Sequence, residues 1–149
     1  MDPASAVIGV VSGSATIVAA SVKTIQFLTS LQDSYKRTEL VIWDLRSTCQ
    51  AFETAWSQIH LWASEQTSRE VAAGSIFEQL LAYLEVSKII FSSLQNDLER
   101  LEKSLKPSWR LSPKSRARIL IHEKQFNDHC GRLHRQISSL NLLLSTARL

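Results

Sequence analysis

The segment from Pro3 to Val22 contains no Asp, Glu, Lys, Arg or His over twenty residues, and it reads PASAVIGVVSGSATIVAASV. As a helix it is long enough to cross the hydrocarbon core of a bilayer, which takes about 20 residues. Its content of Gly, Ser, Thr and Ala equally suits a helix that packs closely among other helices. The chain must therefore bury this segment in a fold or place it in a membrane, and the sequence leaves both alternatives open.

A helix is expected over about residues 3–31. Asp2 is a suitable N-cap and Pro3 suits the first helical turn. Apolar residues recur at alternating steps of three and four, and further aliphatic residues fall outside that stripe, so the helix is apolar nearly all round. The stripe comprises Ile8, Val11, Ala15, Val18, Val22 and Ile25, and the residues outside it are Val7, Val10, Ile17 and Phe27.

The same segment contains a G-x-x-x-G motif, formed by Gly9 and Gly13 and extended by Ser5 at the same spacing. In lipid, small residues at this spacing let two helices approach closely. In a soluble bundle they let a neighbouring helix approach in the same way. The motif therefore indicates a close helix contact, and both settings stay open.

Three further helices are predicted at about residues 38–63, 69–105 and 113–147. Gly74 leaves a later start of the second of these, at Ser75, open. Pro107 ends this helix because Pro disfavours helix at the preceding residue. Each has a narrow apolar seam with three- and four-residue steps or a heptad repeat. Trp43 and Trp62 lie off their seam and should cover neighbouring helices. The seams are Ile42, Leu45, Cys49, Phe52, Trp56, Ile59 and Ala63; Leu80, Leu84, Ser87, Phe91, Leu94, Leu98, Leu101 and Leu105; and Ile119, Phe126, Leu133, Leu140 and Ala147, with Cys130, Ile137 and Leu144 as a second row.

Four such helices predict an all-α fold, an antiparallel four-helix bundle that forms one domain over residues 1–149. A chain of this length buries about 68–70% of its unfolded surface, so it needs no disulfide. Its two cysteines, Cys49 and Cys130, occupy apolar positions, which indicates a reducing, intracellular compartment. Asp2, with no Lys or Arg before the apolar run, disfavours a secretory signal peptide.

Charge is unevenly distributed along the chain. Residues 1–99 carry six Lys and Arg against eleven Asp and Glu, whereas residues 100–149 carry eleven against three. A basic half attracts anionic lipid, nucleic acid or an acidic partner. Nucleic acid is not expected, because Trp109 is the one aromatic residue in the basic cluster and no recognised motif is present. The alternatives left are a solvated basic surface and an anionic-lipid patch with Trp109 at the interface, whose candidate residues are Arg110, Lys114, Arg116 and Arg118.

No catalytic, cofactor or metal site is predicted. His122, Cys130 and His134 share roughly one side of the last helix, and zinc accepts such ligands, but their spacing matches no familiar site. The sequence contains no Glu-x-x-His pair, no Gly-rich phosphate loop and no G-x-S-x-G elbow. We therefore expect a protein without enzymatic activity.

The opening segment MDPASAVIGVVSGSATIVAASVKTIQFL and the closing segment ARILIHEKQFNDHCGRLHRQISSLNLLLSTA carry a family resemblance. They resemble the HeLo-like group, the N-terminal helical domains of fungal NOD-like (STAND) receptors and of related ankyrin- or kinase-linked proteins. The similarity covers nearly the whole chain. It rests on Met-Asp-Pro followed by a small-plus-aliphatic helix, and on a Ser-Leu-x-Leu-x-Leu-like end of the last helix.

The resemblance implies a non-enzymatic module of programmed cell death and innate immunity. It implies a protein that is cytoplasmic at rest, whose N-terminal helix is released on oligomerisation and permeabilises the plasma membrane. The implied partners are further copies of the chain, anionic membrane lipids, and an upstream receptor or amyloid-type signalling partner. The alternative is a homotypic or heterotypic adaptor domain of a STAND-type receptor without membrane activity. The candidate insertion or oligomerisation residues lie within residues 4–22: Val7, Ile8, Gly9, Val10, Val11, Gly13, Ile17, Val18 and Val22.

Overall fold

The structure is a computed structural model that describes residues 3–34, 40–66, 74–105 and 122–148. These residues form four helices: α1 (Pro3–Ser34), α2 (Leu40–Gln66), α3 (Gly74–Leu105) and α5 (Glu123–Arg148). The described part of the chain contains no strand. Helices α1 and α2 continue slightly beyond their predicted ends. Helix α3 begins at Gly74, one residue before the later of the two predicted starts. Residues 113–121 of the predicted last helix lie outside the described residues.

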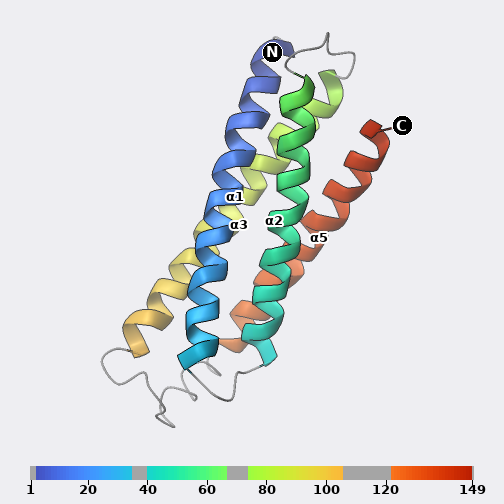
Figure 1. Cartoon of the computed structure of the whole chain (residues 1–149). Helices are drawn as coiled ribbons and strands as arrows, with labels where there is room; N and C mark the ends of the chain where they lie inside the picture. The colour runs from blue at the N-terminus through green and yellow to red at the C-terminus, as the bar shows by residue number, and fades with distance from the viewer. Residues whose placement is uncertain (1–2, 35–39, 67–73, 106–121, 149) are drawn as a thin grey trace.

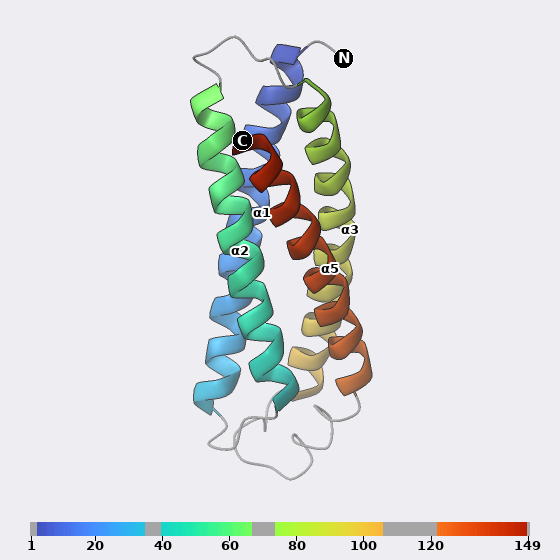
Figure 2. The same cartoon turned by 90° about the vertical axis from the view of Figure 1, so that its right-hand side faces the viewer.

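The helices pack as a bundle in which consecutive helices run in opposite directions (Figure 1). Helix α1 packs against α2 and α3, and α5 packs against the same two helices. Thus α1 and α5 occupy opposite corners of the bundle, and α2 and α3 occupy the other two (Figure 2). The predicted antiparallel four-helix bundle is confirmed, with the added feature that α1 runs parallel to its neighbour α3.

The core is built from the predicted seams of α2, α3 and α5, whose described members are buried or, for Ile137, partly buried. Aromatic rings link α2 to α3 across the diagonal of the bundle. The ring centroids of Phe52 and Phe91 lie 5.2 Å apart, and Trp62 stacks on Phe77 at 5.0 Å. Trp62 thus covers another helix, but that helix is α3, which lies diagonally opposite and is not a neighbour of α2. The same prediction is wrong for Trp43, which is 56% exposed.

Helix α1 buries a different stripe from the predicted one. Ile8 and Val22 of the predicted stripe are 64% and 40% exposed, and Ala15 is exposed as well. The core-facing residues are displaced by one position and follow the same alternating spacing. They are Val7, Val10, Ser14, Ile17, Ser21, Thr24, Leu28 and Leu31.

The buried stripe of α1 tolerates three hydroxyl side chains because each bonds within its own helix. Ser21 Oγ donates to the Ile17 carbonyl at 2.8 Å, and Thr24 Oγ1 donates to the Ala20 carbonyl at 3.0 Å. A hydroxyl that is already bonded costs little to bury. Burying this stripe also places the larger Leu28 and Leu31 in the core, each worth about 1.5–3 kcal/mol when buried.

Candidate functional site: the seat of helix α1

Helix α1 approaches α3 through its two glycines. A Cβ atom added to Gly9 would lie 3.0 Å from Leu81 Cδ2, and one added to Gly13 would lie 2.7 Å from Leu84 Cδ1. The leucine side chains of α3 therefore occupy space that any larger residue would need. In the folded bundle the G-x-x-x-G motif provides close packing within the chain.

On its other flank, α1 is hydrogen-bonded to α2. The Nδ1 atom of His60 lies 3.0 Å from Ser14 Oγ and 3.1 Å from the Val11 carbonyl oxygen. Towards the other end of the helix, Arg46 Nη1 donates to Gln32 Oε1 at 2.6 Å. Helix α1 is thus held in the bundle by apolar glycine contacts with α3 and by polar contacts with α2.

The contact between α1 and α3 opens along the second half of α1. One groove there, of about 310 Å³, is lined by Lys23, Phe27 and Leu98 among others. A second groove, of about 590 Å³, is lined by residues that include Ala19, Val22 and Gln95. Close packing of α1 on α3 is therefore concentrated in the N-terminal half of α1, where the glycines lie.

The outward face of α1 is exposed yet carries no charge before Lys23. It presents Ser5, Ile8, Ser12, Ala15, Thr16, Ala19 and Val22 to solvent. By length and composition, α1 between Ser5 and Asp33 is able to cross a membrane, a test that core helices of soluble proteins also pass. Only 33% of its most apolar window is buried in the bundle, so α1 is not a fully enclosed core helix.

The structure spreads the predicted insertion residues around the whole circumference of α1. Val7, Val10 and Ile17 are buried, and Ile8 and Val22 are exposed. The remaining four, Gly9, Val11, Gly13 and Val18, are half-buried on the flanks. The predicted anionic-lipid residues Arg110, Lys114, Arg116 and Arg118 and the neighbouring Trp109 lie outside the described residues.

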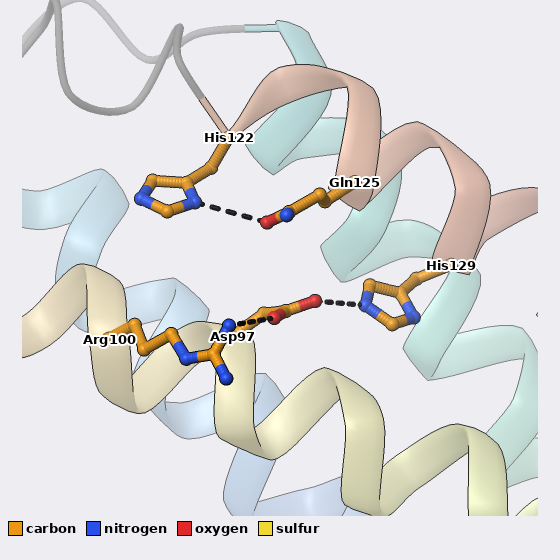
Figure 3. Close-up of polar contacts among 5 residues, drawn as sticks. All are labelled: Asp97, Arg100, His122, Gln125 and His129. Carbon is orange, nitrogen blue, oxygen red and sulfur yellow. Dashed lines mark hydrogen bonds and ion pairs between the residues drawn. The ribbon is translucent and has the colours of Figure 1, made fainter.

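A buried polar pair that the sequence analysis missed links α3 to α5 (Figure 3). The Nε2 atom of His129, which is 2% exposed, lies 2.6 Å from Asp97 Oδ2, and Arg100 Nη1 lies 3.8 Å from Asp97 Oδ1. Asp97 lies next to Leu98 and His129 lies next to Cys130, and both of these neighbours belong to the predicted seams. This adjacency is the only feature of the sequence that points to the pair. The Nδ1 atom of His129 is buried without a hydrogen-bond partner, and neither residue lines the grooves described above. The pair therefore joins α3 to α5.

The three residues considered for zinc have other contacts. His122 Nδ1 lies 3.2 Å from Gln125 Oε1, and His134 Nε2 lies 3.1 Å from Thr48 Oγ1 (the first pair is drawn in Figure 3). Burial raises the pKa of the Cys130 thiol, and a hydrogen bond to Thr48 partly opposes that rise. Within residues 3–34, 40–66, 74–105 and 122–148, no three His, Cys, Asp or Glu side chains are grouped so that they could hold a metal ion.

No family model, curated protein or solved structure matches this chain. The resemblance to the HeLo-like group therefore stays a prediction from the sequence.

Proposed function

We propose that this protein is a non-enzymatic signalling module of cell death or innate immunity, and that α1 leaves the bundle after oligomerisation and permeabilises a membrane. The observation that carries the proposal is the outward face of α1, which is solvent-exposed and uncharged from Ser5 to Val22. A helix face that only ever met water would gain solubility from charged side chains there.

The internal hydrogen bonds of α1 support this transfer. A helix enters hydrocarbon at low cost when its polar groups are paired within the helix. Six Ser and Thr hydroxyls of α1, three of them within residues 3–22, donate to carbonyl oxygens of the same helix, so neither water nor a neighbouring helix is needed to satisfy them. These donors are Ser14, Thr16, Ser21, Thr24, Thr29 and Ser30.

The position of Lys23, the first charged residue after Asp2, fits the same proposal. Twenty helical residues from Pro3 to Val22 extend about 30 Å, which is the thickness of a bilayer's hydrocarbon core. Lys23 then falls at the membrane surface, where its long side chain reaches the headgroups. The basic residues of segment 106–121 would steer the protein to anionic lipid, each contributing about 1 kcal/mol near the surface.

The test compares Ala15→Asp on α1 with Ala82→Asp on α3. Both alanines are exposed, so both variants should keep the bundle folded. Asp at the centre of a spanning helix costs about 2.5–3.5 kcal/mol. We expect Ala15→Asp to lower leakage of anionic liposomes by roughly a hundredfold and Ala82→Asp to leave it unchanged. Equal leakage by the two variants would refute insertion of α1.

An adaptor domain without membrane activity is the second candidate. Leu40 and Trp43 at the start of α2 are 76% and 56% exposed, and aromatic side chains are enriched in protein interfaces. An adaptor would self-associate or bind its partner in lipid-free buffer and ignore vesicles. Liposome flotation with and without anionic lipid, run beside light scattering in lipid-free buffer, separates the two functions.

A further inference from the structure

His60 makes a hydrogen bond whose direction the geometry determines. Its Nδ1 atom lies within 3.1 Å of the Val11 carbonyl oxygen, which can only accept, so Nδ1 carries the hydrogen. The Ser14 hydroxyl already donates to the same carbonyl at 3.1 Å, so its oxygen is left to accept from His60 at 3.0 Å. One N–H of α2 is thus shared by two oxygen atoms of α1.

We propose that His60 is a latch that holds α1 in the closed bundle, an inference that rests on the proposed release of α1. His60 belongs to α2 and hydrogen-bonds to Val11 and Ser14, both of which lie within the segment that would insert. The second polar contact of α1, between Gln32 and Arg46, lies beyond the segment that would insert. On the opposite flank of α1, Gly13 packs against Leu84, and this apolar contact is not directional as a hydrogen bond is.

The surroundings of the latch let it open without leaving a buried polar group unpaired. His60 is half-buried, so water replaces α1 as the acceptor of its N–H once α1 has left. Ser14 keeps its hydrogen bond to the Val11 carbonyl within α1.

The experiment measures amide hydrogen exchange of each helix in lipid-free buffer for His60→Ala, Ser14→Ala and Thr48→Val. The last is the matched control, because it removes a hydroxyl–histidine contact that links α2 to α5. Loss of one net hydrogen bond should raise exchange in α1 about fivefold in His60→Ala. Ser14→Ala should give a smaller rise in α1, and Thr48→Val should leave α1 as in the wild type.

Two outcomes would overturn the latch: unchanged exchange of α1 in His60→Ala, or an equal rise in all four described helices. Should His60→Ala fail to fold, the exchange of α1 in Ser14→Ala tests the latch instead. This substitution removes only the hydroxyl oxygen that accepts from His60 and leaves the rest of the α1 surface unchanged. Liposome leakage separates the latch from the proposed function. Faster exchange of α1 in His60→Ala without any leakage by this variant or the wild type would support the latch and refute membrane insertion. Leakage that Ala15→Asp abolishes, together with unchanged exchange of α1 in His60→Ala, would support membrane insertion and refute the latch.

Discussion

Two glycines of this chain have opposite surroundings. A Cβ atom at Gly13 would lie 2.7 Å from a methyl group of the buried Leu84, whereas the nearest atom to one at Gly131 is the Arg135 guanidinium at 3.9 Å. The first glycine is therefore needed for close packing of α1 on α3. The second lies in a helix interior with space around it, where glycine only lowers stability.

The two positions predict opposite effects of the same substitution. Gly13→Ala should lower the free energy of unfolding by about 1–2 kcal/mol, because overpacking outweighs the gain in helix propensity. Gly131→Ala should raise it by about 0.5–1 kcal/mol. Urea denaturation followed by circular dichroism measures both. A stabilised Gly13→Ala variant would mean that Leu84 moves aside easily and that the glycine contact does not hold α1.

At the scale of the helix, α1 differs from the other three helices because apolar residues lie both on its core-facing side and on its solvent-facing side. The companions have one apolar seam each, while α1 has two candidate stripes displaced by one position. Val10 lies in the stripe that faces the core and is fully buried, and Val22 lies in the outward stripe. The same pair of stripes lets α1 be part of a bundle while presenting an uncharged face to solvent.

A matched pair of valine truncations tests this orientation of α1. Val10→Ala should lower the free energy of unfolding by about 1.5–3 kcal/mol, because it removes two methyl groups from the core and leaves a cavity. Val22→Ala should change it by less than about 0.5 kcal/mol. Thermal and urea unfolding of the two variants give the comparison. A larger loss for Val22→Ala would show that α1 is rotated relative to the arrangement described.

For the whole molecule, the stability of the bundle should depend on alkaline pH through a buried thiol. Burial, and to a lesser extent the neighbouring Cys130, raises the pKa of Cys49 to about 12 from 9.0. The folded chain therefore holds this proton more tightly than the unfolded chain does. The resulting stability is fully present below about pH 9 and is lost as the pH rises towards 12.

Cys49→Ala removes this dependence and leaves every other titrating group in place. We expect the free energy of unfolding of the wild type to fall more steeply than that of the variant between about pH 9 and pH 11. Urea unfolding at several pH values measures the two slopes. Parallel curves would show that the Cys49 thiol is not kept protonated by the fold.

The spacing of apolar residues along the chain is enough to predict much of the bundle. Helices α2, α3 and α5 have narrow seams, and a narrow seam has one way to face a core, so residues such as Leu45, Leu94 and Leu133 could be assigned in advance. Helix α1 is apolar nearly all round, so hydrophobicity does not distinguish its two stripes. The glycine contacts with Leu81 and Leu84 distinguish them, and these contacts require α3 to be in place.

The polar contacts that join the helices could not be predicted from the sequence either. Asp97 and His129 are 32 residues apart in the chain, and Ser14 and His60 are 46 apart. Nothing in their local sequence marks them as partners. The sequence by itself therefore determined that four helices form, and which face of three of them is buried, because helical periodicity is a local property. Only the tertiary structure decided which face of α1 meets solvent and which side chains hold it, because these depend on how closely two backbones approach.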